Sequence, residues 1–326
     1  MRRREFIGGL GATVTLPLGA RAQQPAMSVI GFLGIGTLEE ARANFAAVSR
    51  GLAEAGYVEG RNLSVEFRCA DYHSEQLPAL ASDLVQRQVA AIIAPSGPAI
   101  SAAQAATKSI PIIFFTGFDP VASGFVASLN RPGGNLTGIF TLNPELLAKR
   151  LELLHELVPA AKSIALLFSP TGITSTEAVF QKLKEAASAL GVQLLFQKAS
   201  ELAEFEEVFE MLARERIGAF LVGSDAVFTN NCDRLVALAA HHNIPAMYPI
   251  RECSEAGGLL SYGTDYYDAR RQVGIYVGRT LRGEKPADLP VQQVTKIELV
   301  INMKTAKALG LAFPLSMLGR ADQVIE

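Results

Sequence analysis

The sequence predicts an α/β protein with two doubly wound lobes. Short apolar runs alternate with helical patterns along most of the 326 residues, which is typical of parallel strands joined by right-handed crossovers. The length exceeds that of a usual single domain. Hydrophobic residues make up 49% of the chain and charged residues 19%, which is enough apolar material for two cores.

The first part of the chain predicts strands that alternate with helices. Each strand is a short apolar run, and each helix has apolar residues at helical spacing. Gly56 suits a left-handed C-cap after the first helix, and Pro98 suits the first turn of the third. The expected strands are 28–33, 62–67, 89–94 and 110–115, and the expected helices are 38–55, 75–87 and 98–107.

The same alternation of strands and helices starts again after residue 140. We interpret residues 112–140 as the last strand and loop of one lobe, followed by the first crossing to the other lobe. Pro159 ends the first helix after this crossing, and Gly191 and Gly283 follow the ends of two others. The expected strands are 163–168, 192–197, 218–222, 245–248, 258–261, 290–294 and 298–301, and the expected helices are 145–157, 174–190, 204–216, 233–240, 265–281 and 304–309.

One large sheet is the competing interpretation of this pattern. Polar breaks at 131–135, near 263 and at 284–288 instead favour three crossings between two lobes. We therefore divide the chain into two discontinuous lobes, which are 27–140 plus 264–286 and 141–263 plus 287–326.

The N-terminus carries the pattern of an export signal. Three arginines at 2–4 precede an apolar run at 7–18 and an A-x-A site at 20–22. The apolar run is too short to span a bilayer, which needs ~20 residues. We expect residues 1–22 to be a signal peptide of the twin-arginine type, and the mature chain to be periplasmic without stable membrane insertion.

Charge and composition argue against several partners and cofactors. The net charge of −2 makes nucleic acid an unexpected partner. Adjacent His241 and His242 point in different directions on a helix, so no metal site is expected. The three cysteines are expected to be buried apolar residues. The formation of one disulfide bond between two of them is the alternative in an oxidising compartment.

The sequence lacks the motifs of the common catalytic classes. There is no phosphate-loop G-K-[ST] and no G-x-S-x-G, and the glycines at 34 and 36 lack the third glycine of a dinucleotide fingerprint. We therefore expect neither catalysis nor a cofactor. An α/β hydrolase remains the alternative from the enzyme class.

Ligands of open parallel sheets bind outside the carboxyl ends of the strands, so the loops after strands are candidates. The start of the helix after Ser96 favours an anion, although a plain capped start is equally compatible. Asp119 and Asp225 either cap helices or pair with a ligand ammonium group. Asp225 is the preferred ammonium partner, because Pro120 suits the position after a capping Asp119. Nearby Phe and Tyr side chains either form an apolar wall of the ligand site or belong to the hydrophobic core.

The candidate ligand-binding residues share a place at or beside these loops. They are Gly36, Thr37, Ser96, Gly97, Ala99, Thr116, Asp119, Thr171, Ser224, Asp225 and Tyr248.

Many short motifs, in order along the mature chain, resemble one family. They are GL at 51–52, GY at 56–57, EGRN at 59–62, IP at 110–111, DPV at 119–121, RPGGNLTG at 131–138, KRLELL at 149–154, GGL at 257–259, YG at 262–263, KPADLP at 285–290, Asn302, Ala306 and LGL at 309–311. This set resembles the substrate-binding proteins of ABC transporters in the family that includes tryptophan- and tyrosine-binding members. The resemblance implies a type I periplasmic-binding-protein fold, in which two lobes joined by a three-strand hinge close around a ligand.

The resemblance implies a solute receptor that partners an ABC permease. Its ligand loops fall by position on residues 36–37, 96–99, 116–119 and 224–225. We expect a monomer that binds a small zwitterion or carboxylate, such as an amino acid, possibly an aromatic one, with its carboxylate at 96–99. A sensor module that docks on a signalling receptor is the alternative binding role.

Overall fold

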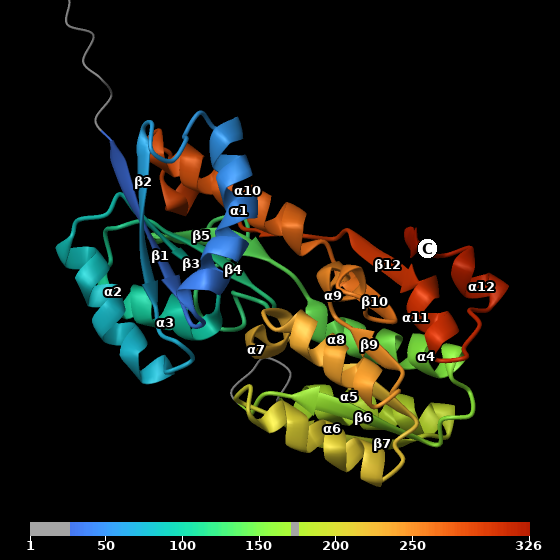
Figure 1. Ribbon diagram of the computed structural model, residues 1–326. Coiled ribbons are helices and arrows are strands. Elements are labelled where there is room, and N and C mark those ends of the chain that lie inside the picture. The colour runs from blue at the N-terminus through green and yellow to red at the C-terminus, as the bar shows by residue number, and fades with distance from the viewer. Residues whose placement is uncertain (1–26, 171–175) are drawn as a thin grey trace, which may run out of the picture.

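The chain folds into two α/β lobes, each built on one sheet (Figure 1). This computed structural model describes residues 27–170 and 176–326, apart from the side chains of residues 143 and 144. The expected signal peptide and the candidate Thr171 lie outside the described residues. The predicted fold class is confirmed.

The first sheet has six strands, in the order β11-β5-β4-β3-β1-β2, and all its pairs are parallel. Its central strands are buried on both faces, which is why they read as continuous apolar runs. The strands are β1 (Ser28–Gly34), β2 (Leu63–Cys69), β3 (Ala91–Ala94), β4 (Ile112–Thr116), β5 (Leu136–Phe140) and β11 (Gln292–Gln293).

Helices cover both faces of this sheet. They are α1 (Leu38–Glu54), α2 (Leu77–Gln86), α3 (Gly97–Ala106) and α10 (Tyr266–Leu281), with short 3₁₀ turns at Ser74–Gln76 and Pro286–Asp288. Helix α10 comes from late in the chain and lies beside α1 (Figure 1). Glycines permit this close approach, because a Cβ on Gly51 would lie 1.8 Å from the carbonyl oxygen of Arg271, and one on Gly274 would lie 2.0 Å from that of Val48.

The second sheet has seven strands, in the order β13-β12-β10-β9-β8-β6-β7, and only β10 and β12 are antiparallel. Its strands are β6 (Ser163–Phe168), β7 (Gln193–Lys198), β8 (Ala219–Val222), β9 (Ala246–Tyr248), β10 (Leu260–Thr264), β12 (Ile297–Asn302) and β13 (Gln323–Ile325). Its helices are α4 (Leu147–Leu157), α5 (Glu177–Leu190), α6 (Glu204–Arg214), α7 (Ala226–Thr229), α8 (Cys232–His241), α9 (Arg251–Glu255), α11 (Met303–Ala308) and α12 (Leu315–Leu318), after a 3₁₀ turn at Asn143–Leu146.

Three connections join the lobes: β5 to the turn before α4, β10 to α10, and β11 to β12. The third differs from the expected boundary at 287, because β11 pairs with Ile139 and Phe140 in the first sheet. Val294 N–H also donates to the carbonyl of Phe140 at 2.9 Å, so the crossing comes after residue 294. The glutamines of β11 are exposed at a sheet edge, so no apolar pattern marks them as part of that sheet.

Two of the three cysteines form a disulfide, which the expectation of buried apolar cysteines left open. Cys232 at the start of α8 is bonded to Cys253 in α9, with their Cα atoms 4.9 Å apart. Cys69 is free and half-buried at the end of β2. The bond therefore links two helices of the second lobe.

The described residues contain no helix that is long and apolar enough to cross a membrane. Within the same ranges, no group of three or more His, Cys, Asp or Glu side chains has the arrangement of a metal site.

Candidate ligand-binding site

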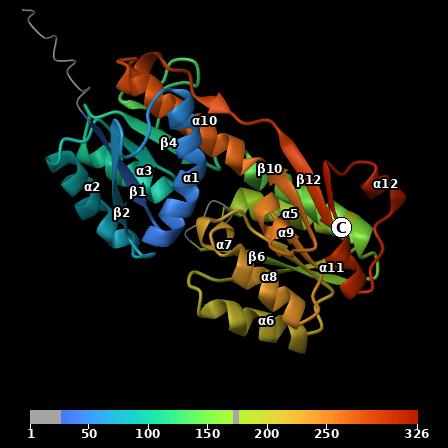
Figure 2. The ribbon, with the colours of Figure 1, turned by 45° about the horizontal axis from the view of Figure 1, so that its top comes forward.

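A cleft of about 340 Å³ lies between the two lobes. The first lobe contributes the loops after β1, β3 and β4, the first turns of α1, and Tyr266 and Arg270 of α10. The second lobe contributes the loops after β6 and β8 and the helix α7. Helices α1 and α7 face each other across the boundary (Figure 2). This is the strand-end position at which ligands bind in open parallel sheets.

Most of the candidate residues meet in this cleft. They contribute backbone from glycine-containing loops, hydroxyl groups and one carboxylate. The candidates that line the cleft are Gly36, Thr37, Ser96, Gly97, Thr116, Ser224 and Asp225.

Three other candidates are not brought to the cleft. Ala99 is fully buried in the core of the first lobe. The Asp119 carboxylate is exposed and accepts the N–H groups of Val121 at 2.8 Å and Ala122 at 3.2 Å, in a turn that takes the place of the expected helix start. Tyr248 is 1% exposed and packs in the second lobe, because the side chain of this strand residue points into the core.

The start of α3 and the end of β4 each present a buried hydroxyl to the cleft. Ser96 is the N-cap residue, but its side chain makes no capping hydrogen bond. The Ser96 and Thr116 hydroxyl oxygens are both buried without a hydrogen-bond partner among the described residues. The first N–H groups of a helix also lack intrahelical acceptors and favour an anion. This side of the cleft can therefore bind an acceptor such as a carboxylate.

Gly97 leaves the helix start open to close approach. A Cβ at this position would lie 3.2 Å from the ring of Phe118, so a larger residue would press on that ring. Phe32, Phe115, Phe118, Tyr72 and Tyr266 are the aromatic residues that line the cleft. Phe115 and Tyr266 are packed edge to face, with ring centroids 5.1 Å apart. They provide an apolar wall beside the polar groups.

Asp225 faces the cleft from the second lobe. Its side chain is nearly fully buried and does not cap α7, although it precedes that helix. One carboxylate oxygen instead accepts the N–H of Ser169 in the loop after β6, at 3.1 Å. A buried carboxylate at the cleft wall suits a ligand ammonium group.

A buried arginine supports the loop that carries Asp225. Arg150 of α4 is fully buried and donates to the hydroxyl of Ser224 at 2.9 Å and to the carbonyl of Tyr262 at 2.5 Å. Burial lowers the pKa of Arg150 to about 10, so the guanidinium stays charged at neutral pH. Arg150 thus fixes the position of the loop at residues 224–225.

Arg270 of α10 is a second cation, partly buried, and this one lines the cleft. Its side chain is 17% exposed, and its guanidinium lies 5.5 Å from the ring centroid of Tyr266 and 3.7 Å from the Glu252 carboxylate. Within the described chain, its N–H groups donate no hydrogen bond. Burial lowers the pKa of Arg270 and raises that of Glu252. The guanidinium N–H groups can therefore donate to a carboxylate in the cleft.

Hydrogen bonds cross the cleft from α1 to the α7–α8 junction. The Asn231 amide donates to the Tyr72 hydroxyl at 3.0 Å and to the Glu40 carboxylate at 3.4 Å, and the Tyr72 hydroxyl donates to Glu40 at 2.6 Å. Burial and this contact with Glu40 raise the pKa of Tyr72. We call Glu40, Tyr72 and Asn231 the clasp. It holds the two lobes together at the edge of the cleft.

The sequence analysis missed Arg270 and the clasp. A signal exists for Glu40, because Thr37 and Glu40 match the spacing of a capping box, and both of its hydrogen bonds are present. Arg270 stands one turn into the helix that follows the second crossing, which places it near the hinge. Nothing in the local sequence marks Asn231, because its partners lie 159 and 191 residues away.

The fold and the cleft define the class of this protein. Two α/β lobes with mostly parallel sheets, three connections and a cleft at the strand ends form a type I periplasmic binding protein. The chain matches the family of ABC transporter substrate binding proteins over residues 32–325 and belongs to it. The resemblance in the sequence motifs is therefore confirmed.

Three relatives illustrate the family. A tyrosine-binding protein of Clostridioides difficile is 29% identical over 275 residues, which are 84% of this chain and 78% of that protein. The ABC domain from Streptococcus pneumoniae in complex with L-Trp is 26% identical, with a TM-score of 0.79 over 92% of this chain and 100% of that one. A ligand-free, open substrate-binding protein with adhesive properties from Clostridium difficile is 25% identical, with a TM-score of 0.61 over 92% and 99%.

Proposed function

We propose that this protein is the solute receptor of an ABC importer and binds an amino acid, with aromatic amino acids as the first candidates, between its lobes. The role is binding and delivery to a permease, with no chemical turnover. Family membership supports the coarse assignment, and the polar groups of the cleft support the ligand class.

The observation that carries this proposal is the opposition of charge in one cleft. The first lobe offers buried hydroxyls at Ser96 and Thr116 and the guanidinium of Arg270, and the second offers the Asp225 carboxylate. A zwitterion matches this arrangement, with its carboxylate toward the first lobe and its ammonium group toward Asp225. The Ser96 and Thr116 hydroxyls then gain a partner, which avoids a penalty of about 1–3 kcal/mol per unsatisfied group.

An aromatic side chain suits the remaining wall. Phe115, Phe118 and Tyr266 line the cleft next to the polar groups. The relatives described as tyrosine-binding and as a complex with L-Trp support the same class. We therefore propose L-tyrosine and L-tryptophan as the first ligands to test.

Calorimetry with matched analogues tests the proposal. L-Tyrosine has two counterparts, tyramine without the carboxylate and 3-(4-hydroxyphenyl)propanoate without the ammonium group. We expect the amino acid to bind and both analogues to bind at least tenfold more weakly. A thermal shift should accompany binding, because a ligand at 100 times its Kd adds ~2.7 kcal/mol of stability. Equal binding of all three compounds would contradict recognition of a zwitterion.

We also propose that the chain is exported to the periplasm through its N-terminal arginines. Replacing Arg3 and Arg4 together by lysine should leave the unprocessed protein in the cytoplasm if the route requires twin arginines. Fractionation of cells with an antibody against the mature chain measures this. Unchanged export of the Lys-Lys variant would point to the general secretory route instead.

A further inference from the structure

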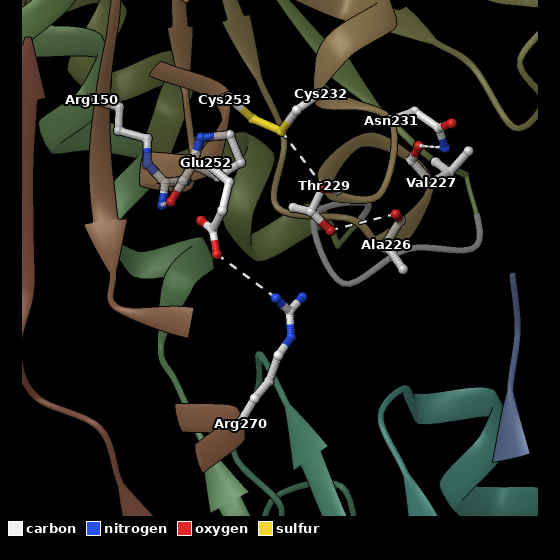
Figure 3. The surroundings of a disulfide bond; sticks show 10 residues. Arg150, Ala226, Val227, Thr229, Asn231, Cys232, Glu252, Cys253 and Arg270 are labelled. Atoms are coloured by element: carbon white, nitrogen blue, oxygen red, sulfur yellow. Dashed lines mark hydrogen bonds and ion pairs between the residues drawn. A yellow bond between two sulfur atoms is a disulfide. The ribbon is translucent and has the colours of Figure 1, made fainter. Parts of the chain in front are cut away.

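The disulfide joins the two segments of the second lobe that contact the first lobe across the cleft. Asn231 of the clasp directly precedes Cys232, and Glu252, the ion-pair partner of Arg270, directly precedes Cys253. Figure 3 shows Glu252 reaching toward Arg270 beside the disulfide, with Asn231 next to Cys232. Both interlobe contacts are thus one residue from the same covalent bond.

Both contact residues lie at or near the ends of helices. Asn231 stands between the four-residue helix α7 and the ten-residue helix α8, and Glu252 is in the five-residue helix α9. Helices as short as α7 and α9 are far below the ~12–15 residues at which an isolated helix is even marginally stable, so their positions depend on contacts with the rest of the lobe. Asn231 precedes α8 but makes no side-chain cap, since its amide donates to the carbonyl of Val227 at 2.8 Å and to the clasp. A crosslink therefore restricts where Asn231 and Glu252 can lie.

The position of Asn231 has to be maintained closely. Its side-chain amide nitrogen has two hydrogens and lies within hydrogen-bond distance of three acceptors, namely Val227, Tyr72 and Glu40. A small shift of the α7–α8 junction would move the amide away from the first lobe and leave it bonded only to Val227, in its own lobe. Asn230, which accepts from Asn44 at 3.4 Å, would move with it.

We propose that Cys232 and Cys253 are positioning residues for ligand retention, because their disulfide holds Asn231 and Glu252 against their partners in the first lobe. This inference rests on the proposed function of the cleft. The disulfide keeps the clasp closed over a bound ligand. Without it, the lobes separate more readily and the ligand dissociates faster.

The test compares the double variant Cys232→Ser/Cys253→Ser, the variant Asn231→Ala, and the triple variant. Cys69→Ser is the matched control, because it removes the free thiol and leaves the disulfide. Small-angle scattering of the ligand-free protein reports the separation of the lobes, and stopped-flow dissociation of L-tyrosine or L-tryptophan reports retention.

We expect the double variant and Asn231→Ala each to raise the radius of gyration and to speed dissociation about three- to tenfold, as the loss of one or two interlobe hydrogen bonds requires. The triple variant should be no worse than the double variant, since both changes act through the same contact. Additive effects would overturn the proposal, as would a double variant with a lower melting temperature but unchanged scattering and dissociation.

Two further arms keep the outcome decisive. If the double variant does not fold, the wild-type disulfide is reduced with dithiothreitol, which supplies two electrons and two protons, leaves two thiols and becomes a cyclic disulfide. The same readouts then apply. If neither amino acid binds, the proposed ligand class is wrong, but scattering of the ligand-free variants still tests the disulfide.

Discussion

Two aspartates show how residues with the same local pattern acquire different roles. Asp119 and Asp225 both stand where the sequence predicts a helix start, and sequence reasoning assigns each either a cap or a ligand contact. Asp119 accepts the N–H groups of Val121 and Ala122 as a capping residue would, but the described residues from Pro120 to Gly124 form a turn instead of a helix. The Asp225 carboxylate instead accepts the N–H of Ser169, which is 56 residues away in the sequence. That contact depends on the pairing of β6 with β8, which local sequence cannot specify.

Arg270 is the residue for which we expect the largest loss of affinity. Arg270→Met should weaken binding of an amino acid by roughly 2–5 kcal/mol, because a partly buried, charged hydrogen-bonding partner is removed. Calorimetry measures the change. Arg271→Met is the matched control on the same helix, because Arg271 pairs with Glu54 and Asp268 away from the cleft. An equal loss in both variants would show that the effect is structural.

Asp225 is expected to recognise the ammonium group. Asp225→Asn keeps the shape of the side chain and an oxygen that can accept from Ser169, but removes the charge. Binding of L-tyrosine should fall by roughly 2–5 kcal/mol, while binding of 3-(4-hydroxyphenyl)propanoate, which has no ammonium group, should change little. Asp233→Asn, at an exposed position of α8, is the control. An equal effect on both compounds would exclude an ammonium contact.

At the level of elements, apolar runs and turn residues predict most strands, and long-range contacts explain the exceptions. The buried strand β3 and the start of α3 follow from an apolar run that ends at Pro95. Strand β11 cannot be predicted from an apolar run, because its two exposed glutamines join the sheet through backbone pairing with β5. The disulfide is equally hidden, since three cysteines allow several pairings and spacing selects none of them.

The packing of α10 on α1 depends on glycine. Gly51→Ala should destabilise the protein by about 1–3 kcal/mol, because the added methyl group would meet the backbone of Arg271 at 1.8 Å and force the helices apart. Urea unfolding measures the free energy. Gly134→Ala is the control, since a Cβ there meets nothing within 4 Å. If Gly51→Ala were as stable as that control, helices α1 and α10 could move apart without a loss in the free energy of unfolding.

At the scale of the whole molecule, the lobes are held by three connections, the clasp and the Arg270–Glu252 pair. This arrangement keeps the lobes in contact through the clasp. In it, the Ser96 and Thr116 hydroxyls are buried without partners among the described residues, and such burial is unfavourable unless a ligand supplies them.

This cost predicts that the ligand-free protein in solution is a mixture of closed and more open molecules, and that ligand shifts the mixture toward the closed ones. Opening lets water reach Ser96, Thr116 and Arg270, whereas a zwitterion that contacts both lobes binds the closed arrangement more tightly, and only that difference shifts the equilibrium. Scattering should show a smaller radius of gyration when L-tyrosine or L-tryptophan is added. At the same ligand concentration, Arg270→Met should stay open, because it lacks the contact that favours closure. A radius of gyration that does not change when calorimetry shows binding would mean that the lobes are already closed, and the clasp alone would then outweigh the cost of the unsatisfied groups.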